Sequence, residues 1–119
     1  MPDLTVETRQ VGDVIVVCPQ GFINAHTVRQ FEQALSQAME QGDGKILING
    51  SGLAYIASAG LGVIMGLIED TRAKGGDIRL AELNDTVRNI FEVLVFNLLC
   101  QVLTSEREGV ESYQAGTKG

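Results

Sequence analysis

The chain has few basic residues, few cysteines and no long apolar run, and each shortage argues against a class of function. Its 119 residues include 9 Lys and Arg against 15 Asp and Glu, which gives a net charge of −6. Nucleic-acid binding needs a basic surface and anionic lipid needs a polybasic anchor, so neither is expected. No apolar stretch approaches the roughly 20 residues of a membrane span. The N-terminus also lacks the basic and apolar regions of a signal peptide, so we expect no membrane insertion.

Cysteine and histidine are scarce as well, which leaves few ligands for a metal ion. Cys18 and Cys100 lie in separate apolar runs without a Cys-x-x-Cys pair, and His26 is the single histidine. Two reduced, buried thiols in a cytoplasmic protein account for this pattern. We therefore expect no metal site, no cofactor and no redox role.

Apolar periodicity predicts strands and helices in alternation. Residues 4–8 alternate as in a half-exposed strand, 14–18 form an apolar β-branched run, and a turn at 11–13 joins the two. Pro19-Gln20-Gly21 is expected to end the second strand. Asn84 or Asp85 is expected to cap a short helix. The other predicted elements are helices after residues 27, 58 and 105, strands at 46–48, 78–83 and within 95–103, and a loop at 49–57.

The resulting order is ββαβαβαβα. An opening β-hairpin followed by alternating strands and helices predicts an α/β fold, with a mixed, mostly parallel β-sheet and helices packed on it. A hydrophobic fraction of 45% with 20% charged residues is typical of one globular domain at this length. We expect that domain to span residues 1–113 and residues 114–119 to form a frayed tail.

The junction between a short strand and a helix at residues 52–66 is the most informative part of the chain. Its one hydroxyl near the expected helix start is Ser58. Serine is a favoured N-cap, because its oxygen can accept from the free backbone N–H groups of the first turn. The same free N–H groups and the helix dipole favour a phosphate. Ser58 is therefore either a plain cap or a phosphorylation site.

Two enzyme-like patterns were considered at this junction. His26 could act as a base on Ser58, but the nucleophile elbow Gly-x-Ser-x-Gly is not present, since Ile56 stands where its first glycine belongs. A serine hydrolase thus remains a remote alternative. The glycines Gly60, Gly62 and Gly66 lack the spacing of a dinucleotide fingerprint. We expect them to let the start of the helix approach the sheet closely.

The junction also carries a family resemblance. Residues 55–62 (Tyr-Ile-Ala-Ser-Ala-Gly-Leu-Gly) resemble the Asp-Ser-Ser/Thr-Gly-Leu-Gly signature of bacterial anti-sigma factor antagonists, which are single-domain members of the STAS family. Residues 21–24 (Gly-Phe-Ile-Asn) resemble the family's loop before the first helix. Residues 75–78 (Gly-Gly-Asp-Ile) are similar to its Gly-Gly turn, and residues 87–92 are similar to its Val-x-x-x-Phe helix. The resemblance covers nearly the whole chain.

The resemblance implies a binding switch and not an enzyme. A family member of this kind binds an anti-sigma factor, usually also a serine kinase, and so releases a sigma factor. The kinase phosphorylates a serine at the helix start, Ser58 here, and a PP2C-type phosphatase removes the phosphate. The resemblance further implies a cytoplasmic protein that is monomeric. The residues expected to contact the partner are Asn24, Ala25, Ala57, Ser58, Ala59 and Leu61.

Three positions depart from the family signature. Ala57 replaces the acid before the acceptor, Ala59 replaces the following hydroxyl, and Asn24 replaces the acid of the earlier loop. These changes fit either a different kinase or a member that binds its partner constitutively and is never phosphorylated. With Ala57 in place of the signature's acid, a charge that would oppose a phosphate is also missing. A further alternative is a STAS interaction module that acts in trans on a transporter or a sensory complex.

Overall fold

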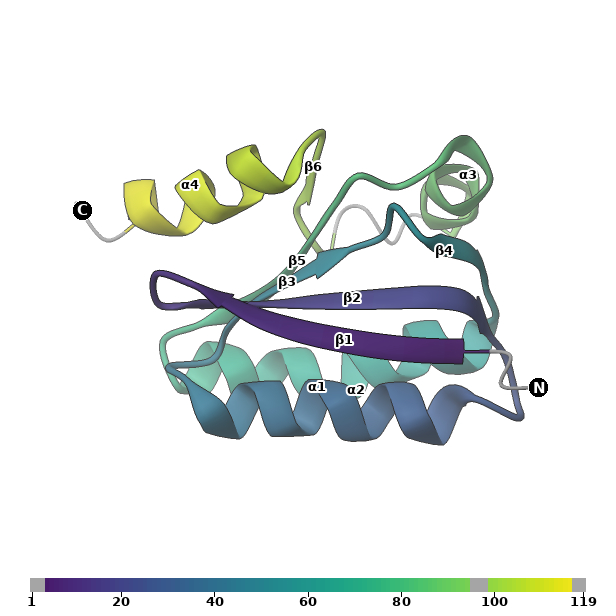
Figure 1. Cartoon of the computed structure of the whole chain (residues 1–119), viewed down its shortest axis with the longest axis horizontal. Coiled ribbons are helices and arrows are strands. Elements are labelled where there is room, and N and C mark those ends of the chain that lie inside the picture. Colours follow the sequence, from purple (N-terminus) through teal and green to yellow (C-terminus); the bar gives the residue numbers. More distant parts are fainter. Residues whose placement is uncertain (1–3, 95–98, 117–119) are drawn as a thin grey trace.

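A six-stranded sheet forms the centre of the molecule (Figure 1). The computed structural model describes residues 4–94 and 99–116. The first two strands form the expected antiparallel hairpin, in which Val11 pairs with Val14. The elements in chain order are β1 (Leu4–Val11), β2 (Val14–Ile23), α1 (Val28–Gln41), β3 (Lys45–Asn49), β4 (Leu53–Ile56), α2 (Ser58–Ala73), β5 (Asp77–Ala81), α3 (Asp85–Val93), β6 (Val102–Leu103) and α4 (Glu106–Gly116).

The sheet has the strand order β1-β2-β3-β5-β6, and β4 pairs with β2. All pairs except β1–β2 are parallel, so the predicted mixed, mostly parallel sheet with an opening hairpin is confirmed. The long strand β2 pairs with two different strands along its length. Its residues 15–17 pair with β3, and its residues 21–23 pair with β4.

Two of the predicted strand limits were wrong, and both errors concern β2 and β4. Strand β2 does not end at Pro19-Gln20-Gly21 but continues to Ile23. Pro19 falls between the register with β3 and the register with β4, where the missing N–H costs no bond to either strand. The expected loop at 49–57 contains β4, which has only four residues and exposes two of them. Such a strand carries almost no periodic signal.

The C-terminal third of the chain follows the prediction in part. The Asn84 side chain accepts from the Val87 N–H (2.8 Å), so Asn84 and not Asp85 caps α3. The last strand is Val102–Leu103, and the remaining part of the segment proposed for it includes residues 95–98, which lie outside the described residues. The predicted end of the last helix was wrong, because α4 continues to Gly116 and so includes residues 114–116 of the expected tail, while residues 117–119 are not described.

Helices cover both faces of the sheet. Helices α1 and α2 lie against one face (Figure 1), where Phe31 and Leu35 of α1 and Ile64 and Ile68 of α2 are buried. Helix α4 lies on the opposite face, and its Tyr113 hydroxyl is bonded to the backbone oxygens of Ile46 (2.6 Å) and Asp77 (2.7 Å). This second core is small, and α3 lies beside β4 toward the other end of the sheet (Figure 1). The buried residues of the second core are Val14, Val16, Leu47, Ala81, Val110 and Tyr113.

A glycine contact joins the entries to β3 and β5. The Asp77 N–H donates to the Gly44 carbonyl oxygen (3.0 Å), and the Gly76 N–H donates to Thr71 (2.8 Å). A Cβ on Gly76 would lie 2.1 Å from the Gly44 oxygen. The second glycine of the Gly-Gly turn is thus required by the backbone approach that starts both strands.

Candidate functional site

Ser58 is the first residue of α2 and is exposed. The chain leaves β4 at Ile56, and the Ala57 N–H donates to the Ile23 carbonyl oxygen at the end of β2 (2.8 Å). This bond fixes the start of α2 beside the loop that leads into α1. The serine hydroxyl therefore lies at the edge of the sheet, next to the loop before α1.

The expectation that Ser58 could serve as the N-cap was wrong. The N-cap is Ala57, whose backbone is extended (φ −83°, ψ 167°) and whose methyl group offers no hydrogen-bond acceptor. The Ala57 carbonyl oxygen accepts from the N–H groups of Gly60 (2.9 Å) and Leu61 (3.3 Å). In the described part of the chain, the N–H groups of Ser58 and Ala59 have no protein acceptor. The hydroxyl and two backbone donors are thus left for solvent or a ligand.

Asn24 organises the neighbouring helix start. Its side-chain oxygen accepts from the N–H groups of His26 (2.9 Å) and Thr27 (3.2 Å), while the Thr27 hydroxyl accepts from the Asn24 N–H (2.9 Å). This reciprocal pattern has the form of a capping box, but it closes the turn before α1, whose N-cap is Thr27. An asparagine oxygen supplies it as well as a carboxylate would, so the departure from the family's acid leaves the loop conformation intact.

We expect Asn24→Ala to lower the free energy of unfolding by about 1–2 kcal/mol, because the substitution removes the acceptor of two N–H groups. Urea denaturation followed by circular dichroism measures this change. Asn24→Asp is the control, since it keeps the acceptor and should stay within about 0.5 kcal/mol of the wild type at neutral pH. Equal losses in both variants would contradict the capping role.

The glycines of α2 divide into two groups. A Cβ on Gly60 would lie 2.7 Å from side-chain atoms of both Ile23 and Ile56, so the close approach predicted for this glycine is confirmed. The prediction was wrong for Gly62 and Gly66, which have nothing within 4 Å of such a Cβ. Only Gly60 is needed to bring α2 against the sheet.

Alanine substitutions at these glycines should have effects of opposite sign. Gly60→Ala should destabilise the protein by about 1–2 kcal/mol, because the contact with two isoleucines outweighs the better helix propensity. Gly62→Ala should stabilise it by about 0.5–1 kcal/mol, since only the propensity changes. Thermal and urea denaturation of both variants test the pair. A destabilised Gly62→Ala would show that its exposed face is less open than the structure indicates.

The structure brings most of the predicted contact residues to one edge of the sheet. Ala25, Ser58 and Ala59 are exposed, while Asn24 and Ala57 are half-buried. The predicted contact residue Leu61 lies in the core, and only 4% of its surface is exposed. Leu61 therefore supports α2 from beneath and is not part of the exposed surface.

Two aromatic residues beside this edge were missed. Phe22 and Tyr55 are 50% and 43% exposed, and they pair across strands β2 and β4. Met65 is a third large apolar side chain, 54% exposed, on α2. Phe22 follows the expected end of the second strand and Tyr55 lies in the expected loop at 49–57, so no local pattern predicts a cross-strand pair. Exposed aromatic side chains of this size are common at protein interfaces.

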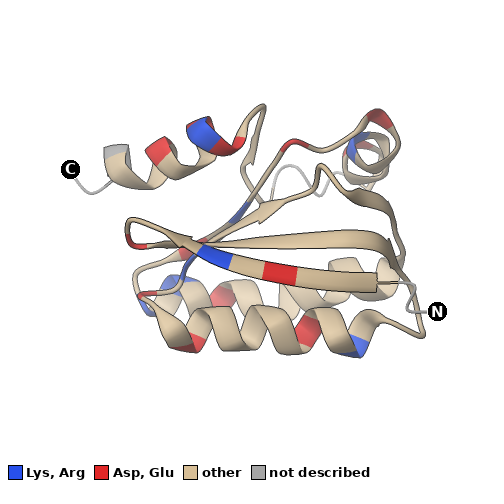
Figure 2. Cartoon of the chain, viewed as in Figure 1, with Lys and Arg blue, Asp and Glu red and all other residues tan. Residues whose placement is uncertain are grey.

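The chain segments that carry Ser58 and its neighbours on β2 and β4 have no charged side chain. No Lys, Arg, Asp or Glu occurs at residues 46–68 or at residues 14–28, which together include β2, β4 and the first two thirds of α2. Figure 2 shows β2 and β4 without acidic or basic colouring. A charge introduced at Ser58 would therefore change the local field greatly.

The structure also describes residues that a catalytic base, a reactive thiol or a metal site would require. His26 is exposed, and no hydrogen bond joins it to Ser58 in the described part of the chain. Burial raises the pKa of the Cys100 thiol to about 12, so this cysteine stays protonated near neutral pH. Within the residues described, no three His, Cys, Asp or Glu side chains gather as they would around a metal ion, and no helix has the length and apolarity to cross a membrane.

Comparison with known proteins identifies the domain family and the relatives of this chain. Residues 5–109 match the STAS domain. The chain is 27% identical over 105 residues to BtrV of Bordetella bronchiseptica, whose name describes it as an anti-sigma factor antagonist, and the match covers 88% of this chain and 90% of that one.

Solved structures share the fold. An anti-sigma factor antagonist from Mycobacterium paratuberculosis superposes with a TM-score of 0.86 at 17% identity, covering 96% of this chain and 97% of that one. The antagonist SpoIIAA in its unphosphorylated form gives 0.77 at 23% identity, covering 93% and 97%. SpoIIAA of Bacillus in its phosphorylated form gives 0.68 at 22% identity, covering 91% and 98%. The resemblance read from the sequence is confirmed, and the chain belongs to the STAS domain family.

Proposed function

We propose that this chain is an anti-sigma factor antagonist that binds an anti-sigma factor kinase through the surface around Ser58, and that phosphorylation of Ser58 abolishes binding. The observation that carries the proposal is an exposed serine on the first residue of α2, whose hydroxyl has no hydrogen bond within the described residues and whose own segment carries no charged side chain. The names of the relatives support the partner class. The proposal concerns regulated binding and not catalysis.

The contact area, called here the switch surface, consists of Phe22, Ala25, Tyr55, Ser58 and Ala59. It joins two exposed aromatic side chains to small residues at the starts of α1 and α2. Small residues let a partner approach the backbone closely, and aromatic side chains supply apolar area at low entropic cost. A flat, uncharged surface of this kind suits a stable docking partner.

A phosphate on Ser58 would act locally. It adds about −1.5 to −2 charges at a surface that a partner must desolvate. The free N–H groups of Ser58 and Ala59 and the dipole of α2 stabilise that charge in the free protein. The fold therefore tolerates the modified serine, whereas a docked partner would have to bury it. The switch needs no change of backbone conformation.

The departures from the family signature favour a phosphorylatable site on physical grounds. Ala57 places no carboxylate beside the acceptor, so nothing on the adjacent backbone repels the phosphate. The Asn24 oxygen already meets the capping demand of its loop. Under this proposal the protein acts as a monomer in the cytoplasm, and a PP2C-type phosphatase restores the binding form.

Phosphate transfer tests the acceptor directly. The protein is incubated with ATP and the anti-sigma factor kinase of its source organism, and intact mass and peptide fragmentation locate the modification. We expect one phosphate on wild type and on Ser51→Ala, a nearby exposed serine variant, and none on Ser58→Ala. Tight binding of the kinase to wild type without any phosphate transfer would support the constitutive alternative instead.

A further inference from the structure

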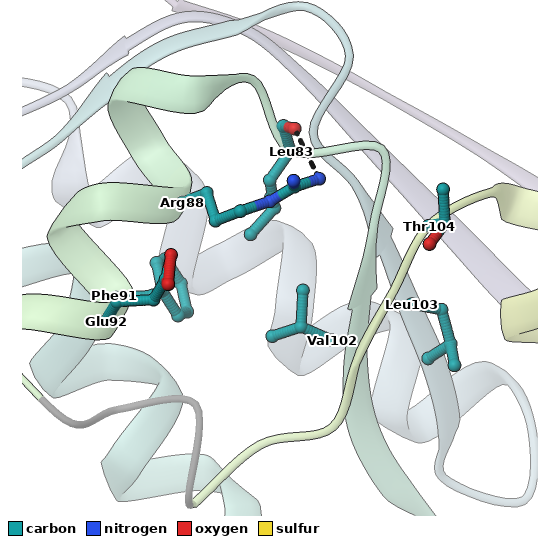
Figure 3. A pocket seen from close by; sticks show the side chains of 7 residues that line it. All are labelled: Leu83, Arg88, Phe91, Glu92, Val102, Leu103 and Thr104. Atoms are coloured by element: carbon teal, nitrogen blue, oxygen red, sulfur yellow. Dashed lines mark hydrogen bonds between the residues drawn. The ribbon is translucent and has the colours of Figure 1, made fainter.

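A pocket of about 240 Å³ lies between α3 and β6, formed by residues that the switch surface does not include (Figure 3). Leu83 precedes α3, while Val102 and Leu103 make up β6. Pockets for drug-sized ligands begin at about 300 Å³. This pocket therefore suits a smaller molecule.

The pocket has an apolar side, and the polar residues Thr104, Arg88 and Glu92 also line it. Leu83 and Phe91 contribute buried surface, 5% and 1% exposed, and half-buried Val102 and Leu103 complete the wall. In Figure 3 the β6 side chains lie across the space from Phe91. An aliphatic or aromatic group placed here would contact the apolar side chains of the pocket and lose part of its contact with water.

Two opposite charges stand at the rim. Arg88 and Glu92 lie one turn apart on α3, and both line the pocket. Among the described residues, the Arg88 side chain makes one hydrogen bond, from Nη2 to the Leu83 carbonyl oxygen at 3.4 Å, and Figure 3 shows its guanidinium directed at Leu83. In the described part of the chain neither residue takes part in an ion pair. The pocket therefore has two exposed, oppositely charged side chains without an ion-pair partner in the described residues beside its apolar side chains.

We propose that this pocket binds a free α-amino acid with an apolar side chain, such as leucine or phenylalanine. The ligand carboxylate would meet the Arg88 guanidinium, which suits carboxylates geometrically, and the ammonium would meet Glu92. The side chain would occupy the space beside Val102 and Leu103. A simple carboxylic acid would leave Glu92 next to an anion, and a simple amine would leave Arg88 next to a cation. The zwitterion is the small molecule that satisfies both charges.

A titration monitored by ¹H–¹⁵N correlation spectra tests this site in the whole chain without any partner protein. L-Leucine and L-phenylalanine should shift amides of α3 and β6 saturably, with a dissociation constant on the order of 1 mM for a ligand of this size. Three matched compounds should bind at least about tenfold more weakly, because each lacks one recognised group. They are 4-methylpentanoate without the ammonium, 3-methylbutylamine without the carboxylate, and glycine without the side chain.

Charge-removing variants complete the test. Arg88→Gln and Glu92→Gln should each weaken leucine binding at least about tenfold. Arg29→Gln and Glu32→Gln, the same changes at exposed residues of α1, should leave it unchanged. The proposal is overturned if leucine gives no saturable shifts, or if 4-methylpentanoate binds as tightly as leucine. It is also overturned if a compound that has the leucine side chain but no free ammonium or carboxylate group binds the pocket as tightly as leucine. None of these outcomes affects the proposal for Ser58.

Discussion

Ser58→Asp should weaken binding to the anti-sigma factor kinase at least about thirtyfold. The substitution places a permanent negative charge at the centre of the switch surface, where residues 46–68 contribute no charge of either sign. Burying an unpaired charge in an interface costs about 2–5 kcal/mol, which corresponds to a loss of about thirtyfold to several thousandfold. The fold should be unaffected, because an acidic residue in the first turn of a helix is stabilised by the helix dipole.

The matched control for this prediction is Ser58→Asn. Asparagine has nearly the size and shape of aspartate but no charge, so it separates electrostatic exclusion from steric exclusion. Calorimetric titration of the kinase with wild type, Ser58→Ala, Ser58→Asn and Ser58→Asp should place only the last variant far below the others. Equal losses for Asn and Asp would replace the electrostatic switch by a steric one. Undiminished binding of Ser58→Asp would place the docking surface elsewhere.

Gly76→Ala should be the most destabilising alanine substitution among the glycines of the Gly-Gly turn and α2. Its Cβ would lie 2.1 Å from the Gly44 oxygen and 2.2 Å from the Gly44 carbonyl carbon. Both atoms belong to the backbone, so no side chain can rotate away, and β3 or β5 must move. We expect a loss of about 3 kcal/mol in the free energy of unfolding, at the upper end for overpacked interiors.

Chemical denaturation measures this loss, and Gly66→Ala is the comparison because its Cβ would enter open space. The midpoint of Gly76→Ala should fall while the denaturant dependence stays unchanged, since the same surface is exposed on unfolding. A loss below about 1 kcal/mol would mean that the two strand entries can separate without disturbing the Asp77 to Gly44 hydrogen bond.

Local chemistry made much of the fold predictable. The β-branched run of β2 and the turn before it are specified by neighbouring residues, as is the capping of α3 by Asn84. The position of Ser58 at a helix start could also be read from the sequence, because the junction pairs a small-residue turn with an apolar helical pattern. In each case the signal lies within a few residues of the element that it predicts.

The rest depends on partners far away in the sequence. Four residues of β4 become a strand only because the end of β2 lies beside them, and β2 extends past Pro19 for the same reason. The exposed pair of Phe22 and Tyr55 is a product of that register. Ser58 lost its expected capping role because Ala57 is held by the backbone of Ile23. No local pattern reports these contacts.

The divided pairing of β2 has a consequence for the dynamics of the switch surface. Strand β4 has β2 as its sole strand partner in the described sheet, whereas β3 lies between β2 and β5. Amides of β4 and the first turn of α2 can therefore exchange with solvent through local opening, while those shared by β2 and β3 wait for global unfolding. A docked partner would slow hydrogen exchange mainly in β4 and the first turn of α2. Binding and release would then alter the protection of one corner of the molecule and leave the kinetics of its central strands unchanged.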